Sequence, residues 1–286
     1  MINLVRSEIL KIRTTNTWWL MMLGLAVVTG LALWINIYTA NDGLNATAGP
    51  PDTTGMDDQS ARQVTEQYAL NRNVAFMASN IYTSGQYFGL LLAMLIGILV
   101  ITNEFFHQTA TPTFLASPRR ERVIAAKLGG ALTWGITFGI LTTVISVAAG
   151  TVFFAVKGVD NGLGNIDVFK AILLNLLAFG IWAVFGLGIG TLLKNQIGSI
   201  VTALVLYLVA QSVVLGILFF LSEWLDKSWI LRVNYYLPSG ASSVMTSAVK
   251  LASDAPPWWG GALTLLAYGA VAAAIGTLIT RRRDIS

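Results

Sequence analysis

The sequence of 286 residues lacks cysteine altogether and has a single histidine and few charged residues. Without cysteine, the chain can form no disulfide, no thiolate metal site and no cysteine nucleophile. Charged residues make up only 11% of the chain, whereas a soluble domain carries about 25%. With 55% hydrophobic residues, a soluble protein would have too little polar surface to cover itself. The composition therefore argues against a soluble protein.

Charge is also absent from six long stretches, at residues 14–41, 73–103, 128–156, 171–193, 195–222 and 255–280. Each is long enough for a membrane-spanning helix, which needs about 20 predominantly apolar residues. A transmembrane β-barrel would show alternating segments of about ten residues instead. The sequence predicts an all-α polytopic membrane protein with a single domain, residues 1–286, and spans at 18–38, 84–102, 128–149, 168–193, 197–221 and 258–280.

The basic residues gather beside the span ends that share one side of the membrane. Six spans place both termini on that side, which then holds 11 of the 18 basic residues but only 4 of the 14 acidic ones. Lys and Arg in short flanking loops mark the cytoplasmic side. We therefore expect a multi-pass protein of the inner (plasma) membrane with both termini in the cytoplasm. The same distribution explains the net positive charge without a nucleic-acid partner.

Three segments outside the spans have a character of their own. Residues 1–15 place Ile2, Val5, Ile9 and Ile12 on one helical face, which predicts a helix lying in the cytoplasmic interface or an ordinary basic flank. Residues 40–80 and 222–257 form extracytoplasmic segments. The second, broken by Pro238 and Gly240, predicts interfacial or re-entrant short helices before the sixth span, or a plain amphipathic loop.

The N-terminal apolar run could be confused with a signal peptide, because Ala46-Thr47-Ala48 resembles a cleavage site. The run is longer than an h-region of about 7–15 residues. We therefore expect it to be retained as the first span.

Motifs for chemistry are absent from the sequence. It contains no G-x-x-x-x-G-K-[ST] phosphate loop and no G-x-S-x-G nucleophile elbow. Apart from Lys170, at the start of the fourth predicted span, no charged residue falls inside a span, although ion-coupled carriers usually need one at membrane depth. The chain is therefore not expected to be an enzyme, and energy for active transport would have to come from another chain.

The spans do contain neutral polar residues and small-residue pairs. Asn36, Thr142, Asn175, Tyr207 and Gln211 are candidates for lining a pathway, or for interhelical hydrogen bonds worth about 0.6–2 kcal/mol each. The spacings Gly135-xxx-Gly139 and Gly186-xxx-Gly190 predict closely packed helices.

The segment ITNEFFHQTATPTFLASPRRERVIAAK, residues 101–127, interrupts the apolar runs with an acid, two prolines and several basic residues. Thr111-Pro112 and Ser117-Pro118 are cap-and-proline pairs that start helical turns. The pattern predicts a short helix around 104–116 inside a cytoplasmic loop at 103–122. Its apolar side chains would either contact a partner or dip into the headgroup region.

The layout resembles the ABC-2 type permease family, the membrane subunits of ATP-driven exporters, over nearly the whole chain. The start LVRSEILKIRTTNTWW, the loop just described, YYLPSGA at 235–241 and the ending RRRDIS are similar to the family's segments, in the same order. No single one of these motifs is specific by itself. Residues 40–80 match nothing in the family and carry no inference from it.

The resemblance implies a pathway formed by two permease chains, the same or homologous, with separate ATPase subunits that bind ATP and Mg²⁺. This chain would bind no cofactor. The short helix would be the coupling helix that docks on the ATPase, with Phe105, Phe106 and Phe114 as anchors and Arg119 and Arg120 at the rim. Glu104 would tie it to its neighbours. The remaining implied coupling residues are Thr109, Thr113 and Leu115.

The substrate would be hydrophobic or amphipathic, such as a drug, a lipid or a peptide. Three alternatives stay open at this point. A secondary carrier would predict ionisable residues or broken helices at the midplane, and an intramembrane enzyme would need a nucleophile–base pair in the spans. A non-transporting scaffold or immunity protein could share the same fold, because fold does not determine function.

Overall fold

A computed structural model describes residues 2–45, 49–108, 120–193 and 195–282. The described residues form helices and loops without a strand. The helices are α1 (Ile2–Arg13), α2 (Thr17–Asn45), α3 (Asp58–Asn71), α4 (Val74–Tyr82), α5 (Gln86–Phe106), α7 (Arg120–Lys157), α8 (Ile166–Leu193), α9 (Gln196–Leu204), η1 (Val205–Ala210), α10 (Gln211–Trp224), η2 (Ser228–Tyr236), α11 (Pro238–Thr246) and α12 (Trp258–Arg282).

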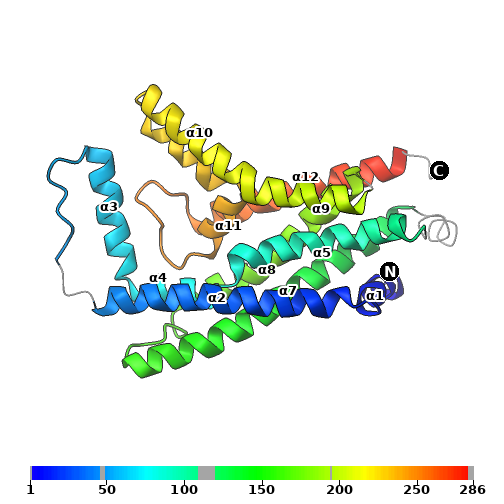
Figure 1. Cartoon of the computed structure of the whole chain (residues 1–286), viewed down its shortest axis with the longest axis horizontal. Helices are drawn as coiled ribbons and strands as arrows, with labels where there is room; N and C mark the ends of the chain where they lie inside the picture. Colours follow the sequence, from blue (N-terminus) through cyan, green and yellow to red (C-terminus); the bar gives the residue numbers. More distant parts are fainter. Residues whose placement is uncertain (1, 46–48, 109–119, 194, 283–286) are drawn as a thin grey trace.

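Six helices are long and apolar enough to span a membrane, which confirms the predicted helical class. They cover Thr17–Asn45, Val74–Phe106, Glu121–Lys157, Ile166–Leu193, Gln196–Trp224 and Trp258–Ile279. They run along the long axis of the molecule, while α3 stands across one end (Figure 1). The last turns of α12 and helix α1 lie at the same, opposite end of the molecule, as an even number of spans requires (Figure 1).

The third span is much longer than the predicted 128–149. Helix α7 has 38 residues, or about 57 Å at 1.5 Å per residue, and a bilayer core is only about 30 Å thick. The predicted start at 128 follows the charged Lys127, but charge does not terminate a helix. The helix ends at Lys157, and the next residue, Gly158, has a φ of 65° in the left-handed region.

The second span is interrupted, which the sequence does not predict. Helix α4 starts at the cap Asn73, whose side chain accepts a hydrogen bond from the Phe76 N–H, and ends at Tyr82. Helix α5 starts three residues after the Thr83 cap, at Gln86. A Cβ at Gly85 would lie 2.7 Å from Thr142 Cβ. The glycine therefore allows the break to press against α7.

Helices α5 and α8 form the centre of the bundle. A Cβ at Gly97 would lie 1.9 Å from the Ala183 carbonyl oxygen, and one at Gly186 would lie 1.9 Å from the Met94 carbonyl oxygen. The glycines thus let the two backbones touch. The close packing predicted from Gly186-xxx-Gly190 is confirmed for α8 on α5. That from Gly135-xxx-Gly139 is confirmed for α7 on α8, where a Cβ at Gly135 would lie 2.5 Å from a carbonyl oxygen.

Helix α1 packs on the bundle through most of its predicted apolar face. Ile12 is buried and Ile9 packs against the main core, whereas Ile2 is 84% exposed. The contact depends on two glycines of α7. A Cβ at Gly129 would lie 3.1 Å from Val5 Cγ2, and one at Gly130 would lie 3.0 Å from Glu8 Cβ.

Candidate functional site

Four charged side chains from three helices meet where α1 packs against α5 and α7. Lys11 Nζ lies 2.6 Å from Glu8 Oε1 and 2.6 Å from Glu104 Oε1. Lys127 Nζ lies 2.8 Å from Glu8 Oε2 and 2.8 Å from Glu104 Oε1. Each ammonium therefore joins the same two carboxylates, and each carboxylate joins both ammoniums. We call these four residues the charge cluster.

The charge cluster is largely out of contact with water. Glu8, Glu104 and Lys127 are 4%, 3% and 1% exposed. Burial of Lys11 favours loss of its proton, but the hydrogen bonds and charges of Glu104 and Glu8 outweigh that effect and raise its pKa. With two positive and two negative side chains, the cluster is electrically balanced. It holds α1, the end of α5 and the start of α7 together.

The local sequence explains how the cluster forms. Glu8 and Lys11 are three residues apart and therefore adjacent on one face of α1. Glu104 lies in the last turn of α5, and Lys127 lies two turns into α7. Lys127 also donates a hydrogen bond to the Val100 carbonyl oxygen, at 3.3 Å. The small Gly129-Gly130 pair beside it lets α1 approach closely enough for Glu8 to reach Lys127.

The structure corrects the start of the predicted short helix at 104–116. Glu104, Phe105 and Phe106 belong to the last turn of α5, which continues past the predicted end at residue 102. The chain leaves the helix only at His107 and at Gln108, whose φ is 54°. Phe105 packs partly against the core, whereas Phe106 is 64% exposed and stacks edge-on with His107.

The other predicted coupling residues stand in or beside the segment outside the described residues. Thr109, Thr113, Phe114, Leu115 and Arg119 lie outside the described residues. Arg120 starts α7, as predicted for the third helix, but its side chain is outside the description. The charge cluster thus joins the helix that enters this segment to the helix that leaves it.

Two predicted pathway residues, Asn36 and Thr142, lie beside the break between α4 and α5, and a third, Asn175, lies on α8. Asn36 Nδ2 donates to Ser84 Oγ at 2.9 Å, which confirms an interhelical hydrogen bond. For Thr142 that expectation is wrong, because its hydroxyl donates to the Gly139 carbonyl within α7. Asn175 lies one turn before Phe179, a residue that Cβ atoms at both Gly89 and Gly139 would touch.

Asn175 is 1% exposed, and its amide forms no hydrogen bond with a described residue. The buried hydroxyls of Thr29 and Ser146 likewise form no hydrogen bond with a described residue. An unpaired buried amide costs free energy that an apolar group of similar shape would not. Of the two roles predicted for Asn175, the interhelical hydrogen bond is not formed with any described residue, and the pathway-lining role stays a prediction.

We expect Asn175→Leu to leave the free energy of unfolding unchanged or to raise it by about 1–2 kcal/mol, because it removes an unsatisfied buried amide. Thr142→Val is the matched comparison and should lower stability by about 1 kcal/mol, because that hydroxyl is hydrogen-bonded. Thermal unfolding of the detergent-solubilised variants measures both. A clear loss of stability in Asn175→Leu would contradict the assignment of an unpaired amide.

Tyr207 and Gln211 line an apolar cavity of about 190 Å³ between α5, α8, η1, α10 and α11. The Tyr207 hydroxyl donates to the Tyr87 carbonyl oxygen, which confirms an interhelical hydrogen bond. The π-helical turn η1 interrupts the fifth span here and is also not predicted from sequence. Such bulges occur frequently at functional sites. Trp182 closes one wall, with its Nε1 2.9 Å from Ser242 Oγ on α11.

Sequence reasoning missed three of the four members of the charge cluster. The sequence predicts flanking charges that set orientation at Glu8, Lys11 and Lys127, the last also within the loop that resembles the family's, and gives no sign that they contact one another. The i, i+3 spacing of Glu8 and Lys11 was a visible signal, but it is also common on exposed helices.

In comparisons with protein-family models and with curated proteins, no family model and no curated protein matches the sequence.

Proposed function

We propose that this chain is the membrane-spanning permease subunit of an ABC exporter of the ABC-2 type. With a second permease chain, the same or homologous, it forms a pathway for a hydrophobic or amphipathic substrate such as a drug, lipid or peptide. Separate ATPase subunits bind ATP and Mg²⁺ and contact the segment between α5 and α7. Both termini, α1 and that segment then lie on the cytoplasmic side of the inner (plasma) membrane.

The charge cluster is the observation that carries the proposal. A force applied to the segment between α5 and α7 reaches both helices, and α1, through the 2.8 Å ion pairs of buried Lys127 with Glu8 and Glu104 and through the partly exposed Lys11. Breaking a buried pair costs about 3–5 kcal/mol. Helices α1, α5 and α7 are therefore expected to move as one rigid unit when the ATPase subunits close.

The apolar cavity beside η1 supports a pathway for apolar groups. Its walls are almost entirely apolar, and Tyr207, Gln211 and Ser239 provide polar groups. Sites for small molecules combine such walls with a few polar groups. The cavity also contacts α11 through Pro238 and Ser239. In this proposal, α11 and η2 form the lid at the extracytoplasmic end.

Coupling has an energetic requirement. Changing a conformational ratio from 1:99 to 99:1 takes about 5.5 kcal/mol of differential binding. The ATPase must therefore bind the permease through closely packed side-chain contacts. Phe106, exposed at the end of α5, is the described anchor for that contact.

We expect Phe106→Ala with Phe114→Ala to reduce co-purification of the proposed ATPase subunit, which we expect the neighbouring reading frame to encode, by at least tenfold, or to abolish stimulation of ATP turnover. Large apolar anchors dominate interfaces, and truncating one costs about 2 kcal/mol or more. Pull-down of the tagged permease from detergent extracts, followed by ATPase assay, measures both quantities.

The matched control is Phe220→Ala, another strongly exposed phenylalanine, at the end of α10 remote from α1. It should leave assembly and turnover unchanged. A double variant that assembles with the ATPase and transports like the wild type would refute the assignment of Phe106 and Phe114 as coupling residues. A complex that assembles but never moves substrate, even with the native anchors, would instead favour a non-transporting scaffold.

A further inference from the structure

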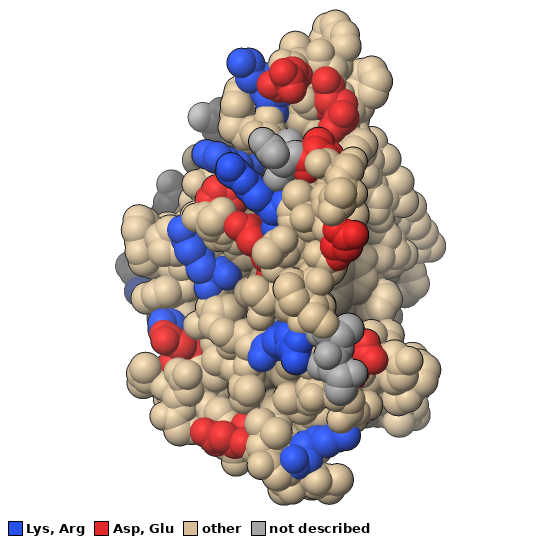
Figure 2. All heavy atoms as spheres, turned by 90° about the vertical axis from the view of Figure 1, so that its left-hand side faces the viewer, with Lys and Arg blue, Asp and Glu red and all other residues tan. Residues whose placement is uncertain are grey.

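The end of the molecule remote from α1 carries basic and acidic side chains intermixed (Figure 2). Here a cavity of about 350 Å³ opens between α3, η2 and the loop before α12. Its size falls in the range of small-molecule sites, about 300–1,000 Å³. Two arginines and two acids line it: Arg62 and Glu66 from α3, Arg232 from η2, and Asp254 from the loop. We call it the outer cavity.

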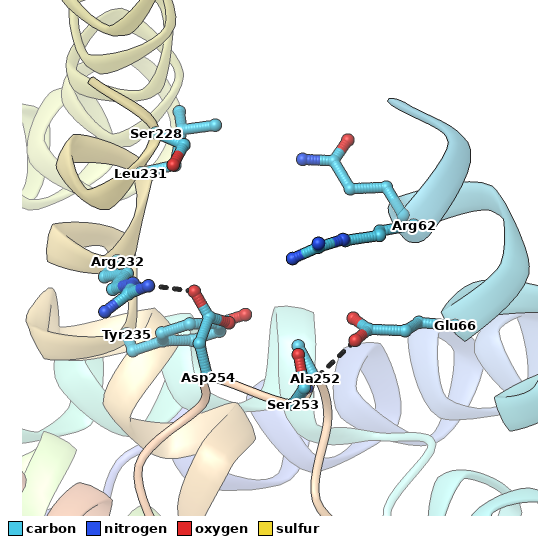
Figure 3. Close-up of a pocket in the computed structure, with 10 residues that line it drawn as sticks. Arg62, Glu66, Ser228, Leu231, Arg232, Tyr235, Ala252, Ser253 and Asp254 are labelled. Carbon is cyan, nitrogen blue, oxygen red and sulfur yellow. Dashed lines mark hydrogen bonds and ion pairs between the residues drawn. The ribbon is translucent and has the colours of Figure 1, made fainter. Parts of the chain in front are cut away.

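Three of these four charges already have partners within the protein. Arg232 Nε lies 2.7 Å from Asp254 Oδ2. Glu66 Oε1 accepts a hydrogen bond of 3.2 Å from the Ser253 N–H, which bridges the two walls. Arg62 extends from the α3 wall into the open space (Figure 3) and makes no ion pair with a described residue. One guanidinium is thus left to receive an anion.

Tyr235 adds a hydrogen-bond donor on the wall opposite Arg62 (Figure 3). Burial, together with the negative charges of Asp254 and Glu66, raises the pKa of its phenol, and Arg232 offsets only part of this. The phenol is therefore neutral at physiological pH. A neutral phenol can donate a hydrogen bond to an anion or accept one from an ammonium.

The charge pattern selects the class of ligand. A purely anionic ligand would meet Glu66 and Asp254 at close range, and a purely cationic one would meet Arg62 and Arg232. A ligand with both charges can place its anionic group beside an arginine and its cationic group beside an acid, so that like-charge contacts are avoided and opposite-charge contacts are formed. Arginine also binds phosphate and carboxylate through two parallel hydrogen bonds.

We propose that the outer cavity binds a small zwitterion, whose phosphate or carboxylate contacts Arg62 and whose ammonium contacts Glu66. Phosphoethanolamine has this chemistry, either free or as the headgroup of a lipid. The site goes beyond the proposed function, because binding here needs no ATPase and no movement of the spans. It also gives a role to residues 40–80, a segment that matches nothing in the resemblance.

The test titrates the purified full chain in detergent with free phosphoethanolamine by isothermal titration calorimetry. Arg62→Gln should weaken binding at least tenfold. Arg72→Gln is the matched control on the same helix, because Arg72 stacks over the Tyr68 ring instead of lining the cavity, and it should bind like the wild type. Glu66→Gln should weaken binding of phosphoethanolamine, whose ammonium loses its partner, but should not weaken binding of inorganic phosphate, because a repelling negative charge is removed.

A second arm distinguishes the two sources of the zwitterion. Native mass spectrometry counts the phosphatidylethanolamine molecules that the chain retains from nanodiscs of that lipid. A count that falls in Arg62→Gln but not in Arg72→Gln identifies the lipid headgroup. The proposal is overturned if neither the free compound nor the lipid binds, or if Arg62→Gln binds both as well as Arg72→Gln does.

Discussion

Replacing Lys127 with methionine should lower the free energy of unfolding by about 3–5 kcal/mol, because it leaves two buried carboxylates with a single ammonium. Lys127 is 1% exposed and contacts both Glu8 and Glu104. Water cannot replace the lost charge at such a site. Thermal unfolding in detergent should show a large fall in midpoint, and the fraction of monodisperse protein should fall with it.

Lys157→Met is the control for this variant, since Lys157 ends the same helix but is exposed. It should unfold within about 0.5 kcal/mol of the wild type, as surface substitutions usually do. The double variant Glu8→Gln with Lys127→Met leaves one ammonium facing one carboxylate and should be more stable than Lys127→Met alone. Equal stability of Lys127→Met and the wild type would refute the structural role of the charge cluster.

The second large effect is expected where α5 and α8 touch. Gly97→Ala places a methyl group 1.9 Å from the Ala183 carbonyl oxygen, and Gly186→Ala places one 1.9 Å from the Met94 carbonyl oxygen. A backbone oxygen cannot rotate away as a side chain can, so the helices must separate. We expect each variant to lose about 1–3 kcal/mol, and the double variant to give little folded protein by size-exclusion chromatography.

Gly216→Ala gives the opposite expectation. A Cβ at Gly216, on α10, would meet no atom within 4 Å. Alanine should therefore be neutral or should stabilise the helix by about 0.5–1 kcal/mol. If Gly97→Ala and Gly216→Ala unfolded at the same temperature, close backbone contact between α5 and α8 would not be holding the bundle together.

Both effects bear on the proposed function. The α5–α8 contact forms the rigid centre, and the charge cluster attaches α1 and α7 to the end of α5. A permease driven by a separate ATPase needs both the α5–α8 contact and the charge cluster, because movement is transmitted through the helices only if they do not move independently of one another. Loss of ATP-dependent transport in Lys127→Met, measured under conditions in which it stays folded, would place the cluster in the coupling route.

The second span illustrates the limits of sequence reasoning. Its apolar residues predict a span at 84–102, and α5 covers that range from Gln86 on. The break before Gln86 is not predictable, because Thr83-Ser84-Gly85 lacks a proline and the gap closes against Thr142 on a distant helix. The sequence predicts Glu104 and Phe106 as coupling residues of a separate short helix. That they belong to α5 instead depends on tertiary packing, which the local sequence does not show.

By itself, the sequence determined that this chain is a bundle of membrane helices, because length and hydropathy are properties of each segment and need no partner. It also indicated where small residues let helices touch. Only the tertiary structure decided that Glu8, Lys11, Glu104 and Lys127 share one buried cluster, and that Arg62 faces Arg232 and Asp254 across a cavity. Along the chain, Glu8 and Lys127 are 119 residues apart, and Arg62 and Asp254 are 192 residues apart. Charges that far apart reveal an interaction only after hydrophobic packing has brought their helices together.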